Sequence, residues 1–341
     1  MPTPLALYYP ENHTAHEQPG HPERPQRVEA IRSALEDAGY WAAGRQVAPL
    51  QLPRALLERT HTPALLQQLE AASQQDASVD ADTYLTPASW ALTQATAGGA
   101  AALAEMVWTR EAEAGFALTR PPGHHAERAR AMGFCLLNNV ALAAEHLLAQ
   151  GAQRLAILDL DVHHGNGTQD IFYEREDVLF ISSHQSPLYP GTGHLNERGR
   201  GAGEGATCNL PLPPFSGDAA FQAAYEEVAI PLLYRFQPDM LLISFGFDAH
   251  WRDPLANLQV SAAGYGAVLA ALRAWGQAQC GGRIALFLEG GYELGAAAAC
   301  SLAAVQALLG EPVTDALGPA TKAEGDRWRA VVDKAKSVWE L

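Results

Sequence analysis

The length, composition and charge of the chain exclude several classes of protein. It has 341 residues, of which 48% are hydrophobic and 18% are charged, a composition that indicates a globular protein and excludes an intrinsically disordered one. The 38 acidic residues outnumber the 23 basic ones, giving a net charge of −15, so we expect no basic surface of the kind that binds nucleic acid. An acidic surface would instead attract cationic small molecules or lysine-rich segments.

The N-terminus and the cysteines favour a cytoplasmic protein. The N-terminal segment lacks a basic stretch followed by an apolar one, so it does not resemble a secretion signal. No uninterrupted apolar run reaches 18 residues, which argues against a membrane span. The four cysteines are far apart and form no CxxC pair, which fits a reducing compartment; they are Cys135, Cys208, Cys280 and Cys300.

In chain order, short apolar runs alternate with longer segments of helical spacing. The runs predict buried strands at 5–9, 115–118, 155–158, 178–181, 240–244 and 284–288. The longer segments predict helices that include 140–148, 221–234 and 265–279. This alternation is typical of an α/β fold with three layers, in which helices cover both faces of a mostly parallel central sheet. Since we find neither a linker nor an internal repeat, we expect one domain over residues 1–341.

Polar residues gather where the predicted strands end. They occupy the segments 119–125, 159–164, 182–184, 245–250 and 289–292. In open parallel α/β sheets, ligands bind outside the carboxyl ends of the strands. We therefore expect these segments to meet at one edge of the sheet.

The segment 159–169, DLDVHHGNGTQ, predicts a metal site. In an extended chain Asp159, Asp161 and His163 would share one side. Carboxylates and imidazoles are ligands of Zn²⁺, and Asp248 from another strand end would bring the protein ligands to three, which leaves the open position typical of a catalytic site. The alternative is a capping turn of solvated charges, which is disfavoured because four ionisable groups beside an apolar strand would carry a large desolvation cost.

Two adjacent histidines, His124 and His125, follow the rigid segment Pro-Pro-Gly at 121–123. A histidine pair can accept a proton from an attacking water and donate one to a leaving amine near neutral pH. Without further context, such a pair is as often a structural feature as a catalytic one. Here Asp159 could orient one imidazole, and the Asn166 side chain could accept a hydrogen bond from the other.

Two glycine-containing segments have different interpretations. At 289–292, EGGY, the glycines could let Tyr292 approach a site and donate to an oxyanion, although a tyrosine packed at a turn is equally consistent with the local sequence. The segment 199–205, GRGAGEG, follows no strand and precedes no helix, so we interpret it as a loop and not as a phosphate-binding motif.

Together these motifs resemble the histone deacetylase family, of the class II type that includes the bacterial acetylpolyamine amidohydrolases. The matches occur in family order over roughly residues 5–310. They are HPERPQR at 21–27, RPPGHHA at 120–126, GFCLLNN at 133–139, DLDVHHGNGTQ at 159–169, PGTG at 190–193, SFGFDAHWRDPL at 244–255 and LEGGY at 288–292. The resemblance implies an arginase/deacetylase-like fold and a metal-dependent deacetylase acting on an acetylated lysine or polyamine.

The resemblance also implies individual roles. Asp161, His163 and Asp248 would bind one Zn²⁺ per chain. His125 would be the general base and acid, with Asn166 as its partner where class I relatives have an aspartate. His124 would be an electrostatic partner held by Asp159. Tyr292 would polarise the carbonyl. A structural K⁺ would use Asp159, Ser182 and the backbone oxygens of Asp161, His163 and Ser183.

For the substrate channel, the resemblance points to Gly133, Phe134 and Tyr189. Apolar walls would strip water from a linear acyl-lysine and leave only its amide at the metal. Polyamine-selective class II relatives carry a glutamate at the position of Leu255, so this departure weakens the polyamine interpretation. It leaves that alternative open, because bacterial relatives recognise polyamines in other ways and an acidic rim could do so here.

Several alternatives remain at this point. A binuclear manganese ureohydrolase would need more bridging carboxylates than the single Asp248 of its segment, and a non-catalytic acyl-lysine binding module would leave the histidine pair and Tyr292 without a role. The same ligands accept iron as well as zinc. The sequence leaves open the oligomeric state, including a homo-oligomer.

Overall fold

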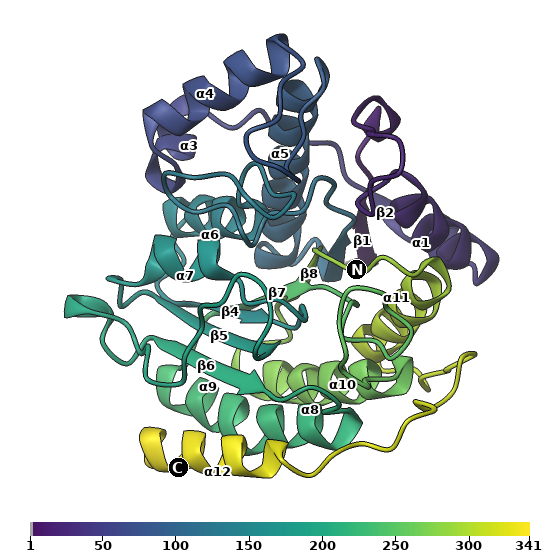
Figure 1. The fold of residues 1–341 in the computed structure, drawn as a ribbon, viewed down its shortest axis with the longest axis vertical. Helices are drawn as coiled ribbons and strands as arrows, with labels where there is room; N and C mark the ends of the chain where they lie inside the picture. Colours follow the sequence, from purple (N-terminus) through teal and green to yellow (C-terminus); the bar gives the residue numbers. More distant parts are fainter. Residues whose placement is uncertain (1–2) are drawn as a thin grey trace.

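The computed structural model describes residues 3–341 and contains an eight-stranded sheet in which every neighbouring pair of strands is parallel (Figure 1). The strand order is β2-β1-β3-β8-β7-β4-β5-β6. The strands are β1 (Thr3–Tyr8), β2 (Arg45–Gln46), β3 (Ala112–Ala117), β4 (Leu155–Asp159), β5 (Val178–Gln185), β6 (Thr207–Leu212), β7 (Met240–Phe245) and β8 (Ile284–Leu288). The predicted α/β fold is thereby confirmed.

Helices cover both faces of this sheet, which produces three layers (Figure 1). On one face lie α5 (Ser89–Trp108), α6 (Asn139–Ala149) and α7 (Asn166–Phe172), with α3 (Arg54–Thr60) and α4 (Pro63–Gln74) packed outside them. On the other face lie α1 (Gln26–Asp37), α2 (Tyr40–Ala43), α8 (Asp218–Ala224), α9 (Ile230–Phe236), α10 (Ala262–Gln279), α11 (Leu294–Leu309) and α12 (Trp328–Trp339). Each face of the sheet therefore has its own apolar core.

All six predicted strands are present, and the two strands that the sequence did not predict are the two edges of the sheet. β2 is only two residues long and both are exposed. β6 contains Asn209 and Pro211, which obscure its apolar character, and proline is tolerated in an edge strand because one side of the strand has no partner. The segment 199–205 is a loop with a short 3-10 turn, Gly201–Gly203, as the sequence predicted.

The helix predicted at 221–234 is interrupted. Between α8 and α9 the chain forms a π-helical turn, Tyr225–Ala229. The hydroxyl of Tyr225 lies 2.9 Å from the Ser183 hydroxyl and donates to the backbone oxygen of Asp159 at 3.2 Å. The wider turn thus places a buried tyrosine beneath the carboxyl ends of β4 and β5, and such turns often occur at functional sites.

The start of α6 is joined to the loop that carries the histidine pair. Asn138 caps this helix by accepting a hydrogen bond from the amide of Ala141 at 3.0 Å. The same side chain donates to the backbone oxygen of Ala126 at 3.3 Å and to the Thr168 hydroxyl at 3.1 Å. One polar side chain therefore links α6, α7 and the histidine loop.

Within residues 3–341, no helix is long and apolar enough to cross a membrane. The four cysteines are buried and free.

Candidate active site

The polar segments at the carboxyl ends of the strands meet at one edge of the sheet, as the sequence predicted. In the central part of the sheet β8, β7, β4 and β5 are consecutive neighbours. Asp159 at the end of β4 is in register with Ser182 of β5 on one side and with Ser244 of β7 on the other. The loops that follow these strands therefore begin side by side.

Asp161, His163 and Asp248 form a cluster of possible metal ligands. One donor atom from each lies within 4.8 Å of the others. The Nδ1 atom of His163 is 3.1 Å from a carboxylate oxygen of Asp161 and 3.1 Å from one of Asp248. Gly290 closes the cluster, since its amide donates to Asp161 at 2.7 Å and a Cβ atom there would lie 2.2 Å from the Asp248 carboxylate. Only glycine fits at this position.

The two buried carboxylates of this cluster require positive charge beside them. Both aspartates are fully buried. Burial opposes a charge on His163, but its hydrogen bonds to Asp161 and Asp248 and their charges raise its pKa to about 10. Two buried carboxylates so close together are stable only beside positive charge. Two carboxylates and one imidazole are a donor set that suits Zn²⁺ or another first-row divalent ion.

His124 pairs with Asp159, the contact that the family resemblance implied. Its Nδ1 lies 2.9 Å from the Asp159 carboxylate, and both side chains are buried. Burial disfavours the charged imidazole, but the carboxylates of Asp159 and Asp161 outweigh it and raise the pKa of His124 well above its ordinary value. His124 is therefore the charged member of the pair.

His125 has the opposite character. Its Nδ1 lies 2.7 Å from Oδ1 of Asn166, a neutral acceptor. Burial, followed by the nearby His124 and His163, lowers the pKa of His125 well below its ordinary value. The adjacent imidazoles, whose ring centroids are 4.0 Å apart, thus divide into a charged and a neutral one.

Tyr292 follows β8 and is positioned through both its backbone and its ring. Its amide donates to the Asp253 carboxylate at 2.7 Å. The guanidinium of Arg27 lies 4.9 Å from the ring centroid, and Phe134 packs edge-on at 5.9 Å. Burial raises the pKa of Tyr292 well above 10, so the phenol keeps its proton and can donate it in a hydrogen bond.

Gly133, Phe134 and Tyr189 lie around this site. Gly133 has φ +56, and a Cβ atom there would lie 2.5 Å from the His125 ring and 3.1 Å from Tyr189. Tyr189 packs edge-on against His125 at 5.1 Å and is 40% exposed. Two partly exposed aromatic rings therefore lie at the site, one beside Tyr292 and one beside His125.

Comparison with known proteins agrees with this geometry. The histone deacetylase domain model matches residues 21–308. A "probable deacetylase" of Archaeoglobus fulgidus is 41% identical over 309 residues, which cover 89% of this chain and 86% of the relative. A "histone deacetylase-like amidohydrolase" of Pseudomonas aeruginosa is 37% identical over 295 residues, covering 85% and 77%. The crystal structure of the HDA15 HD domain superposes with a TM-score of 0.90 at 36% identity, covering 99% of this chain and 94% of that one.

The chain belongs to the histone deacetylase family. It is a deacetylase, a hydrolase of amide bonds, and its fold is the one of that family. These findings favour the deacetylase over the ureohydrolase and over the non-catalytic binding module.

The resemblance also singled out Leu255, Ser182 and Ser183, whose contacts are with other groups than the Asp161, His163 and Asp248 cluster. Leu255 is 38% exposed and follows Pro254, which lines a cavity of about 400 Å³ together with Tyr292 and His21. The Ser182 hydroxyl lies 2.9 Å from His184 Nδ1, while the Ser183 hydroxyl lies 2.9 Å from Tyr225 and 3.5 Å from the backbone oxygen of Asp159.

Two residues of this deacetylase site received no role from the sequence. Arg27, which is fully buried, donates to the backbone oxygens of Gly291 and Glu289, each at 2.5 Å, and so holds the loop that carries Tyr292. The Glu289 carboxylate accepts from the amides of Gly123 at 2.7 Å and His124 at 3.0 Å. Arg27 lies in the motif HPERPQR and Glu289 in the motif LEGGY. Their place in these motifs is the sequence signal that could have identified them.

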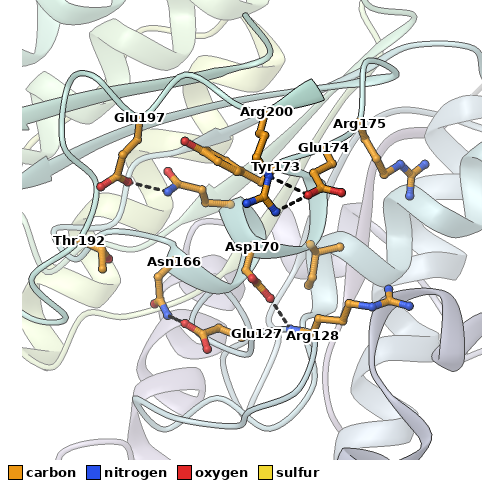
Figure 2. A pocket seen from close by; sticks show the side chains of 12 residues that line it. Glu127, Arg128, Asn166, Asp170, Tyr173, Glu174, Arg175, Thr192, Glu197 and Arg200 are labelled. Carbon is orange, nitrogen blue, oxygen red and sulfur yellow. Dashed lines mark hydrogen bonds and ion pairs between the residues drawn. The ribbon is translucent and has the colours of Figure 1, made fainter. Parts of the chain in front are cut away.

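A cavity of about 530 Å³ is lined by Asn166 and by side chains from the segments around it (Figure 2). Among the residues that line it, Asn166 is the one that contacts His125. Apart from Ile171, the rest of the lining is charged or polar and includes Glu127, Glu174, Glu197 and Arg200. This cavity therefore adjoins the deacetylase site through Asn166.

Proposed function

We propose that this deacetylase is zinc-dependent and removes an acetyl group from N-acetyl-lysine of proteins or peptides. The observation that carries the proposal is the cluster of Asp161, His163 and Asp248 beside the neutral imidazole of His125. A metal-ligand set next to a base is the arrangement that amide hydrolysis requires.

Asp161, His163 and Asp248 would hold the metal, because their donor atoms converge and their buried charges need a cation. When bound, a divalent zinc ion supplies a Lewis acid that polarises the amide carbonyl and makes water more acidic. The protein supplies the remaining chemistry through side chains that hold or move protons.

His125 would take the proton from the attacking water and return it to the leaving amine. Its hydrogen bond to Asn166 directs Nδ1 away from this task, and the low pKa keeps the imidazole available as a base. His124, charged and paired with Asp159, would stabilise negative charge that develops nearby.

Tyr292 would donate a hydrogen bond to the oxyanion that forms from the carbonyl oxygen. Its raised pKa and its packing against Arg27 and Phe134 suit that role, because a preorganised neutral donor needs no rearrangement as charge develops.

The substrate class follows from the approach to the cluster. Phe134 and Tyr189 would flank a linear alkyl chain, as in an acyl-lysine, and the exposed Leu255 offers no charge to a distant ammonium. We further propose that Asp159, Ser182 and Ser183 contribute to a structural K⁺ site, which their register on β4 and β5 supports, and that the chain works in the cytoplasm.

The test is a substrate and metal profile of the purified protein. We expect hydrolysis of acetyl-lysine peptides with a higher kcat/KM than that of acetylated spermidine or putrescine, and one zinc per chain by elemental analysis. A chelator should abolish activity, and stoichiometric zinc should restore it. Faster cleavage of the polyamines would overturn the substrate proposal. If iron or manganese restored activity and zinc did not, the proposal that the enzyme depends on zinc would be overturned.

A further inference from the structure

We propose that Glu127 is a positioning residue, whose carboxylate determines which end of the Asn166 amide faces His125. The inference rests on the proposed role of His125 as a base. It concerns a residue two positions beyond the histidine pair, on the wall of the cavity that Asn166 also lines.

All of the polar atoms of the Asn166 side chain have a partner. Its Oδ1 is 2.7 Å from Nδ1 of His125. Its Nδ2 donates to Oε1 of Glu127 at 2.7 Å and to the sulfur of Met132 at 3.4 Å (Figure 2 shows the bond to Glu127). One acceptor and two donors are thus matched by one donor and two acceptors.

A carboxylate can only accept hydrogen bonds, so it selects one orientation of the amide. If the amide of Asn166 turned over, its oxygen would face the Glu127 carboxylate and its NH₂ group would face Nδ1 of His125. The first contact is repulsive, and the second would require Nδ1 to be the unprotonated nitrogen. In the observed orientation Nδ1 carries the proton, and Nε2 keeps the lone pair that a base needs.

Glu127 is itself held in place through its backbone. Its amide donates to the backbone oxygen of Arg130 at 2.9 Å, and its own oxygen lies 3.0 Å from Nδ1 of His61. The other nitrogen of His61 accepts from the amide of Asn138 at 2.9 Å. Burial lowers the pKa of His61 to about 4, so its single ring proton lies on Nδ1 and is donated to Glu127.

The cavity makes position 127 suitable for substitution. Glu127 is partly exposed there, so a new side chain can extend into a space of about 530 Å³ without entering the core. Glu174 lines the same cavity but pairs with Arg200 and does not contact Asn166 (Figure 2). It therefore provides a matched control.

Three variants test the inference. Glu127→Gln keeps an acceptor for Nδ2, Glu127→Leu removes it, and Glu127→Lys replaces it with a donor that favours the turned amide. The tautomer of His125 is read from ¹⁵N chemical shifts of histidine-labelled protein, with the resonance assigned by comparison with His125→Ala. Kinetics on an acetyl-lysine peptide, zinc content and thermal unfolding are measured alongside.

We expect Nδ1–H in the wild type, in Glu127→Gln and in the control Glu174→Gln, with kcat within about twofold. Glu127→Lys should shift His125 toward Nε2–H and lower kcat about tenfold or more at unchanged KM and zinc content, since general-base catalysis contributes about 10²–10⁴. Glu127→Leu should change the tautomer and kcat in the same direction but by less. If the lysine variant does not fold, the leucine variant provides the test in its place.

The inference is overturned if the Lys and Leu variants both keep the Nδ1–H tautomer, or if Glu127→Gln loses as much activity as Glu127→Leu. The tautomer measurement does not depend on turnover. A wild type that shows the Nδ1–H signature but hydrolyses no acetyl-lysine would count against the proposed function alone.

Discussion

At the scale of single residues, the groups that would hold a cation are distinct from the group that would move a proton. Asp161 and Asp248 carry buried negative charge around His163. His125 lies beside them but is kept neutral by burial and by the neighbouring positive imidazoles, which lower its pKa. Each task therefore depends on a different set of atoms, and substitutions should separate them.

Tyr292→Phe tests the proposed oxyanion donor. We expect the variant to keep zinc and stability, because the ring retains its contacts with Arg27 and Phe134. Turnover on an acetyl-lysine peptide should fall by about 10²–10³, the usual loss when one such donor is removed. Full activity in this variant would remove the hydroxyl from the mechanism.

Asp248→Ala tests the metal ligands. The variant should lose both bound zinc and activity, because two protein ligands would remain and one buried carboxylate would be gone. Elemental analysis after dialysis measures the first effect and a peptide assay the second. Asp170→Ala, at an exposed aspartate that lines the neighbouring cavity, is the control and should retain the metal. One zinc per chain in Asp248→Ala would refute the assignment.

At the scale of elements, the last helix, α12, packs on the core through one side and forms ion pairs on the other. α12 packs Val332, Ala335 and Trp339 against the core. Its outer side forms ion pairs from Arg329 and Lys336 to Glu227. Because apolar burial outweighs partly exposed ion pairs, we expect the helix to be held mainly by its buried side.

Two substitutions in α12 should therefore differ in their effect on stability. Trp339→Ala should lower the free energy of unfolding by about 3–5 kcal/mol, the usual cost of truncating a buried tryptophan. Lys336→Ala should cost less than about 1 kcal/mol, because its pairing with Glu227 is partly exposed to solvent. Urea unfolding measures both, and equal losses would contradict the account.

At the scale of the whole molecule, buried neutral histidines should make the fold sensitive to acid. Burial lowers the pKa of His13, His16, His61 and His164 to about 4 each. The unfolded state has an ordinary histidine pKa near 6.5 and binds more protons between pH 6.5 and 4. The stability that these groups contribute is thus complete above about pH 6.5 and is lost as the pH falls toward 4.

His61 lies outside the cluster of possible metal ligands, so a substitution there measures the acid sensitivity of a buried histidine separately from that cluster. At pH 7 the wild type should be more stable than His61→Gln, because the neutral imidazole joins the backbones of Glu127 and Asn138. As the pH falls from 6.5 to 4, the difference should shrink by about 3 kcal/mol. Urea unfolding of both proteins across this range measures it, and the pH effects common to both cancel. A constant difference would show that His61 is not buried as the neutral form.

Much of the site was visible in the sequence, because its members lie in short segments that follow apolar strands. Asp161 and His163 are two residues apart, and His124 and His125 are adjacent. Glu127 and Arg27 were not identified, although both lie near or within motifs. A glutamate or arginine in such a segment is indistinguishable from a solvated one until its partners are known.

The sequence by itself determined the α/β class and the strands from which the site is built. A strand buried on both faces must be apolar along its length, and ionisable groups placed directly after it carry a desolvation cost that marks them as part of a site. Only the tertiary structure decided the edge strands, the hold of Arg27 on a loop 264 residues away and the alignment of Glu127 with Asn166. These depend on distances between distant segments, which are set by how the helices and the sheet pack and leave no periodic trace along the chain.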